Sequence, residues 1–331
     1  NIAIGTDAMG SLNSTHASSA QDDNIAIGYE ALKGNVVSTA DTQSKNIAIG
    51  SHALMTTSTG AVNGIVAIGY NALKIMTGAG NTAIGYQAGF RHTTGTNCVY
   101  IGDQTGDHCV GGSRNVAIGS GSLSDVAVDD NVAIGFEALK ACTGSDNIAV
   151  GAYAGDGITT ANGNTVMGYN ALTGATPGGY NVAIGHSAGL AVSGGHSSVF
   201  IGFQAGDTMT SGDSNTIIGY GADVSASGAK FQTALGSGVS ADADNQTVIG
   251  SAGVFKLLSK EYTVDHSDDE NAKAASSEAA PLKIPAYSII KSVSAIVTTL
   301  SDRTGTFLVA IFHSNDTSSP TDNTALGGTP V

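Results

Sequence analysis

The chain is built from one short repeat, and this repeat limits the folds that are open to it. The first unit runs from Asn1 to Met9 and has a glycine, Gly5, at its fifth position. In all, 15 glycines occupy this fifth position, and from Gly69 to Gly236 they recur every 16 or 17 residues. A fixed period of this size is typical of a solenoid, in which each repeat forms one coil.

Each unit is too short for the two helices of a helical solenoid, and its glycine disfavours a helix. Positions two and four are almost always β-branched or long aliphatic residues, as in Val116 and Ile118, whereas position three between them is usually alanine. This alternation predicts one short strand per unit, with the large residues on one face and alanine on the other. We therefore expect an all-β parallel solenoid of 15 coils with columns of Ile and Val in its interior.

Two positions of the repeat indicate structural roles. The glycine at position five predicts a backbone with positive φ, or one that a neighbouring coil approaches closely. The asparagine at position one suits a turn, where its amide can bond nearby backbone. The structural glycines of the regular part are Gly85, Gly102, Gly119, Gly135, Gly151, Gly168, Gly185, Gly202 and Gly219.

The alanine column suggests an interface between chains. A column that faces solvent would more naturally be Thr, Ser or Lys, whereas small residues permit close packing against another surface. We infer that this column meets the same column of sister chains and that ring symmetry closes the contact. The candidates are Ala83, Ala117, Ala133, Ala149 and Ala183. The bulky residues that replace alanine at position three would interrupt a uniform seam; they are Tyr100, Val166, Phe200, Ile217 and Val248.

The repeat resembles the head repeat of trimeric autotransporter adhesins. The motif NVAIG at 115–119 and 181–185 carries this resemblance, with a small residue three places on, Ser122 or Ala188. In that family the head is a left-handed parallel β-roll of three chains about one axis. The resemblance therefore implies a left-handed β-roll and a homotrimer over about residues 1–254.

Variants of the repeat are also similar to repeats of bacteriophage tail fibres. They are NTAIGYQA at 81–88 and NIAIGYEAL at 24–32. This similarity implies a structural, non-enzymatic trimeric fibre on the virion surface, such as a phage tail fibre or appendage. Its implied partners are itself, other virion proteins and a glycan or protein receptor on the host cell.

The chain changes character after the repeat. Residues 255–283 are rich in charge and read as a connector, whereas 284–331 contain two apolar runs joined by a short turn. A hairpin alone is marginal in water, so we expect a small C-terminal β-domain, sandwich-like and completed by further strands. No run of about 18 apolar residues occurs, so we predict no membrane insertion. A net charge of −14 disfavours nucleic acid as a partner.

The sequence offers no catalytic, cofactor-binding or metal-binding constellation, and we predict no enzymatic activity. The cysteines form no CxxC pair, and Cys109 and Cys142 lie two coils apart, about 9.6 Å, which is too far for a disulfide. We expect free, mostly buried thiols. His92, Cys98, His108 and Cys109 are the candidates for a zinc site, but their spacing fits no usual zinc frame.

Two features leave the receptor question open. Aromatic residues recur at position six and form either a stripe of stacked rings, which we favour, or a glycan-binding ladder. They are Tyr29, Tyr70, Tyr86, Phe136, Tyr169, Phe203 and Tyr220. Residues 10–23, 33–45 and 55–64 enlarge the early turns, either as recognition loops or as Ser/Thr-rich padding. The sequence identifies no receptor-contact residue.

Two other functions compete with the virion fibre. The first is the passenger head of a bacterial trimeric autotransporter adhesin, which would place the chain on the bacterial outer surface. The second is an ice-binding or polysaccharide-cleaving solenoid. This second alternative is weaker, because the sequence shows neither a Thr-x-Thr column nor acid pairs on successive coils.

Overall fold

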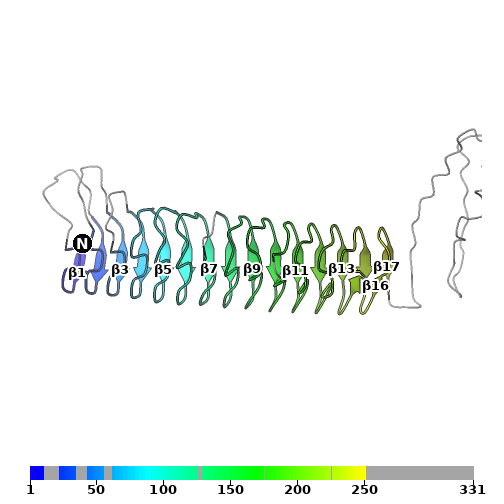
Figure 1. Ribbon diagram of the computed structural model, residues 1–331. Coiled ribbons are helices and arrows are strands. Elements are labelled where there is room, and N and C mark those ends of the chain that lie inside the picture. Colours follow the sequence, from blue (N-terminus) through cyan, green and yellow to red (C-terminus); the bar gives the residue numbers. More distant parts are fainter. Residues whose placement is uncertain are drawn as a thin grey trace, which may run out of the picture. The chain divides into compact units, whose positions relative to one another are not determined.

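A computed structural model describes residues 1–10, 22–34, 43–55, 62–125, 129–174, 176–224 and 226–250. Within these ranges the chain is a solenoid whose coils follow one another in chain order (Figure 1). Each coil contributes one strand of three residues to a long sheet, and two of the coils near the end of the described chain add a second strand of two residues. The strands are β1 Ile2–Ile4, β2 Ile25–Ile27, β3 Ile47–Ile49, β4 Val66–Ile68, β5 Thr82–Ile84, β6 Val99–Ile101, β7 Val116–Ile118, β8 Val132–Ile134, β9 Ile148–Val150, β10 Thr165–Met167, β11 Val182–Ile184, β12 Val199–Ile201, β13 Thr216–Ile218, β14 Asp223–Val224, β15 Thr233–Leu235, β16 Ser240–Ala241 and β17 Thr247–Ile249.

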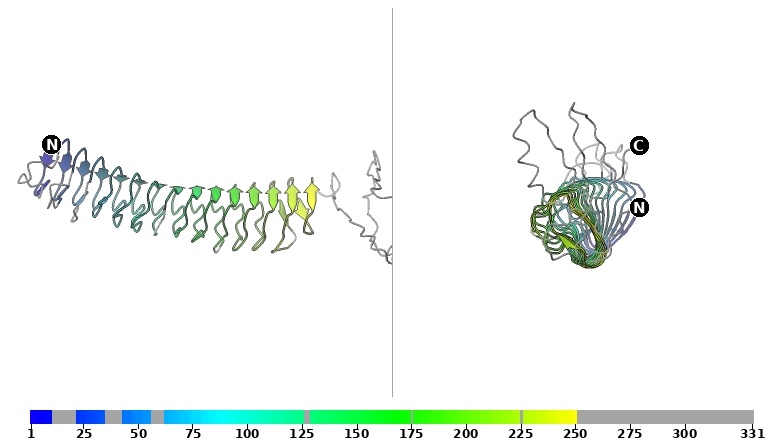
Figure 2. Two further views of the ribbon diagram at one scale, coloured as in Figure 1. Left: turned by 90° about the horizontal axis from the view of Figure 1, so that it is seen from above. Right: turned by 90° about the vertical axis from the view of Figure 1, so that its right-hand side faces the viewer.

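One parallel sheet runs along the solenoid. It has 15 strands, ordered β1 to β13, then β15 and β17, while β14 and β16 form a second sheet of two strands. Neighbouring strands pair in the register of the repeat, so that position three of one coil always lies beside position three of the next. Seen end-on, the outlines of the coils superimpose with a gradual twist (Figure 2). The prediction of an all-β parallel solenoid is confirmed.

No helix occurs in the part of the chain that the structure describes, so none there could cross a membrane. The connector at 255–283 and the C-terminal β-domain at 284–331 lie outside the described residues, as do most of the enlarged early turns.

The position-five glycines have the conformation that the repeat predicts. Their φ angles in the regular part run from 124° to 144°, a region that only glycine adopts readily. A Cβ on Gly135 would also overlap the carbonyl group of Gly151 in the next coil. Glycine is therefore required twice at this position, once by the backbone angle and once by the stacking of the coils.

The two faces of the sheet are the reverse of our expectation. The alanines at position three are fully buried inside the coil, and the Ile and Val residues at positions two and four point outward. The interior is filled instead by residues from the rest of the coil, such as Ala138, Leu139 and Cys142. A coil of 16 or 17 residues encloses little space. Alanine on the strand leaves room for leucine at position nine.

The two aromatic residues at position three, Tyr100 and Phe200, fit into this interior because glycine replaces leucine nearby. Tyr100 lies beside Gly89 and Gly106, and a Cβ on either glycine would contact or overlap its ring. Phe200 has the same relation to Gly189 and Gly206. The sequence suggested that the bulky residues interrupt a seam between chains. The structure shows that they do not. They are core residues whose volume is balanced within the same and the preceding coil.

The asparagines at position one form a buried ladder rather than a turn. The Asn147 backbone N–H donates to Asn131 Oδ1 at 3.0 Å, and the Asn164 N–H donates to Asn147 Oδ1 at the same distance. The Asn147 Nδ2 group donates across the coil to the Ala161 carbonyl at 2.9 Å. The left-handed conformation belongs to the residue before, for example Asp146 with φ 61°. Where position one is asparagine, its side chain is thus both the acceptor and the donor that join one coil to the next.

Candidate functional site

The outward face of the long sheet carries two columns of mostly aliphatic residues. It consists of the position-two and position-four columns, which are half-buried by their neighbours within the column or exposed. Among the more exposed members are Ile84, Ile148 and Met167, at 38–45%. Parallel sheets are ordinarily covered on both faces. Here the described chain covers one face only.

The alanines proposed for the trimer seam cannot serve that purpose. Ala83, Ala117, Ala133, Ala149 and Ala183 each expose 0% of their surface in the single chain. They contact the residues of their own coil and of the neighbouring coils, so another chain cannot reach them. The interface, if one forms on this sheet, belongs to the Ile and Val columns.

The position-six aromatic residues do stack between successive coils. Tyr70 and Tyr86 have ring centroids 5.5 Å apart and an interplanar angle of 15°, and Phe203 and Tyr220 lie 5.3 Å apart at 10°. In such stacked pairs the ring faces are turned toward each other, so little face remains for a sugar ring. The structural interpretation that we favoured is confirmed for the ring contacts. The rings keep exposed edges.

Sequence reasoning missed the residues that continue this ladder where position six is neither tyrosine nor phenylalanine. In two coils position six is Ser or Ala, and the ring comes from position seven as His52 or Tyr153. His186 joins Tyr169 to Phe203. Between Tyr86 and Phe136 the ladder is broken by coils whose position-six residues are Asp103 and Ser120. Counting both positions together would have revealed two continuous runs.

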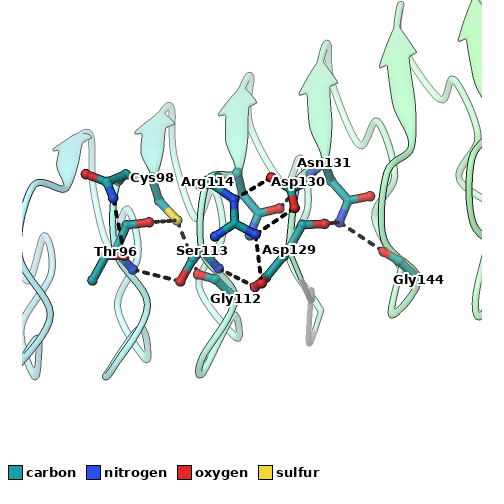
Figure 3. Close-up of polar contacts among 11 residues, drawn as sticks. Thr96, Cys98, Gly112, Ser113, Arg114, Asp129, Asp130, Asn131 and Gly144 are labelled. Atoms are coloured by element: carbon teal, nitrogen blue, oxygen red, sulfur yellow. Dashed lines mark hydrogen bonds and ion pairs between the residues drawn. The ribbon is translucent and has the colours of Figure 1, made fainter.

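A second ladder lies at the corner of the coil, two residues before position one. The Ser113 N–H donates to Asp129 Oδ1 of the next coil at 2.9 Å, and the Thr96 N–H donates to Ser113 Oγ at 3.1 Å (Figure 3). Arg114 lies beside these residues and donates to Asp129 and Asp130. Its guanidinium lowers the pKa of the Asp130 carboxyl. The three charged side chains are about half exposed, so this ion pair adds little to stability.

The cysteines are free and buried, as expected. Burial raises the pKa of the Cys98 thiol, and it raises the pKa of the Cys142 thiol to about 11. His92 is also buried, its pKa is lowered by burial, and its Nδ1 bonds the Cys109 carbonyl at 2.6 Å. His108 instead lies near the surface and bonds Asp107. The three cysteines and His92 fill the core of the coils, and the raised pKa values of Cys98 and Cys142 are unlike those of reactive thiols.

The described residues contain no group of three or more His, Cys, Asp or Glu side chains arranged to hold a metal ion. A shallow groove occurs at one corner, where Tyr180, Asn162 and His196 come together around a volume of about 480 Å³. Sequence reasoning did not find this groove, because its residues come from three successive coils and form no motif along the chain. The chain matches no protein-family profile and no curated protein sequence.

Proposed function

We propose that this chain is the structural, non-enzymatic shaft of a homotrimeric fibre. The observation that carries the proposal is the outward face of the 15-stranded sheet, which is aliphatic at position four of every strand and at position two of all but the five strands that have threonine there. At about 4.8 Å per strand and three residues of about 3.3 Å, this face measures on the order of 70 by 10 Å. The resulting area of about 700 Å² per chain approaches the roughly 800 Å² per partner of a standard stable interface.

Three chains about a common axis would cover this face well. Each chain offers one such face, and rotational symmetry turns the same face of every chain toward the axis. The columns of Ile and Val would then form the centre of the fibre. This arrangement keeps the homotrimer that the repeat implies and replaces the alanine seam with the aliphatic columns.

The proposed role is that of a virion appendage, a tail fibre or a similar structure, which projects from the particle and contacts the host surface. The backbone ladder, the glycine column and the asparagine ladder all recur from coil to coil, and they support a stiff spacer. A trimer presents three copies of every corner and loop, so weak contacts with a host glycan or protein receptor gain avidity. Other virion proteins would hold the fibre to the particle.

The alternative is the passenger head of a bacterial trimeric adhesin. It shares the rod and the apolar face, and it differs in being displayed on the bacterial outer surface. The likeness of the repeat motif NVAIG to adhesin heads is the observation in its favour.

Two experiments test the proposal at two levels. Sedimentation equilibrium of the purified chain should give a mass of about three times the 32.8 kDa of one chain. A monomer at micromolar concentration would contradict the fibre, and a dimer would contradict the three-fold arrangement. Immunogold electron microscopy of a culture with cells and virus particles should place the label on virion fibres. Label confined to the bacterial surface would favour the adhesin.

A further inference from the structure

We propose that the groove around Tyr180 is a binding site for a neutral saccharide. The groove spans three successive coils and is lined by Tyr180, Asn162 and His196, together with Thr160 and Thr176. Its volume of about 480 Å³ lies within the range of small-molecule sites. No lysine, arginine, aspartate or glutamate lines it.

The groove exists because the corner ladder is interrupted at this point. In the coils on either side, the Ser145 N–H donates to Asn162 Oδ1 at 2.7 Å and the His196 N–H donates to Asp213 Oδ1 at 3.1 Å. The residue that should accept from the Asn162 N–H is Gly179, which has no side chain. The Asn162 N–H consequently makes no hydrogen bond to any described residue.

Two further donors beside the groove are unused. The Oδ1 atom of Asn162 accepts the hydrogen bond from the Ser145 N–H. Both hydrogens of the Asn162 Nδ2 group have no partner among the described residues. The His196 Nδ1 atom accepts from the Gly179 N–H at 3.1 Å, so the neutral imidazole carries its hydrogen on Nε2. The groove is therefore rich in hydrogen-bond donors, and it suits a ligand whose oxygens accept hydrogen bonds.

Tyr180 provides the apolar part of the site. Its ring lies over the backbone of Gly163 in the preceding coil, where a side chain would overlap it, and 69% of its surface is exposed. It also has φ 62°, an unusual conformation for a bulky residue. Unlike the rings of the aromatic ladder, it has no stacked neighbour among the described residues. An open ring beside hydrogen-bond donors matches a pyranose, which has one C–H face and a rim of hydroxyl oxygens.

The neutral class of saccharide follows from charge. A sialylated or phosphorylated glycan would bring an anion to a chain of net charge −14, and no cation lines the groove to bind it. The inference rests on the proposed attachment function, to which it adds the class of receptor. Three copies of the groove in one fibre would compensate for the weak affinity of a shallow site.

The test uses the full chain on a printed array of neutral and anionic oligosaccharides, followed by titration of the strongest neutral glycan. We expect wild type and Tyr180→Phe to bind, and Tyr180→Ala to bind at least about tenfold more weakly. Asn162→Asp keeps the acceptor for the Ser145 N–H and removes the amide donor, so it should also weaken binding. Phe231→Ala is the matched control, because Phe231 has the same place in its coil, φ 54° and 58% exposure.

Three results would overturn the site: no binding to any neutral glycan, a preference for anionic glycans, or an equal loss of binding in Phe231→Ala. Sedimentation of the same samples separates this failure from failure of the fibre. A trimer that binds no glycan refutes the saccharide site and leaves the shaft standing. A monomer that binds glycan through Tyr180 refutes the trimer and leaves the site standing.

Discussion

At the scale of single residues, the position-five glycine is the strictest requirement of the repeat. Gly135 has φ 138°, and a Cβ there would overlap the carbonyl group of Gly151. We predict that Gly135→Ala destabilises the chain by about 2–4 kcal/mol, since the backbone conformation alone costs about 1–3 kcal/mol in a residue with a Cβ. Urea unfolding followed by circular dichroism would measure this.

Gly194→Ala is the matched control for Gly135→Ala. A Cβ at Gly194 meets no atom within 4 Å, and its φ is not positive. This variant should unfold within about 0.5 kcal/mol of wild type, as surface substitutions usually do. Equal effects of the two substitutions would show that the close approach of the next coil does not require glycine at position five.

The Cys142 thiol gives a prediction about pH. Burial raises its pKa to about 11 from the ordinary value of 9.0, so the folded state holds its proton more tightly than the unfolded state does. Stability from this group is therefore complete below pH 9 and falls as the pH rises from 9 to about 11. Cys142→Ala should lack this part of the decline, as shown by urea unfolding at a series of pH values. At pH 8 iodoacetamide should leave Cys142 of the folded chain unmodified, as read by peptide mass mapping. Rapid modification there would refute the burial.

At the scale of one coil, position three and position nine share a fixed volume. Tyr100→Ala alone should cost about 3–5 kcal/mol, because it leaves a large cavity. Gly106→Leu alone should also destabilise, since a side chain there would overlap the Tyr100 ring. The double variant restores the common alanine and leucine pattern, which the coil of Ala133 and Leu139 shows. We predict that it is at least about 2 kcal/mol more stable than the sum of the single effects implies.

One outcome of the double-mutant cycle would contradict the shared volume. Additive effects of Tyr100→Ala and Gly106→Leu would mean that the two positions do not share one core. The same cycle at Phe200 and Gly206, which have the same contact, provides a replicate within the chain.

The coil also shows which parts of the structure the sequence can predict. Period and alternation were sufficient for the strand, its parallel register and the glycine conformation, because each depends on backbone geometry that repeats. They could not decide which face is inside. Large aliphatic residues usually point inward, yet Val132 and Ile134 point outward here because leucine from another part of the coil fills the core. The pairing of Tyr100 and Phe200 with nearby glycines was the available signal that position three lies in the core.

The candidate sites also contain residues that the sequence could predict and residues that it could not. The aromatic ladder was predictable from position six, whereas His52 and Tyr153 enter it from position seven. The Tyr180 groove depends on the absence of a side chain at Gly179. Gly179 can be recognised as a gap in the corner ladder only after the structure has shown that ladder. A site that is assembled from three coils leaves no motif along the chain.

At the scale of the whole molecule, the proposed fibre depends on the outward face of the sheet. Val132 and Ile134 lie near the middle of this face and point away from the core. Lysine at both positions would place two charges per chain in an apolar interface, where a buried charge without a partner is costly. Because the side chains point out of the coil, the fold of a single chain should be retained. We predict that Val132→Lys with Ile134→Lys converts the trimer to monomers in sedimentation velocity, with an unchanged β-sheet spectrum.

The matched control for this double variant places lysine elsewhere on neighbouring coils. Ser120 and Thr143 lie outside the sheet columns at partly or fully exposed positions, so Ser120→Lys with Thr143→Lys adds the same charge to the same part of the rod. This control should remain trimeric, because it leaves the aliphatic columns intact. A trimer that survives lysine at Val132 and Ile134 would exclude the sheet face as the interface. Dissociation of both variants would point to total charge and not to the face.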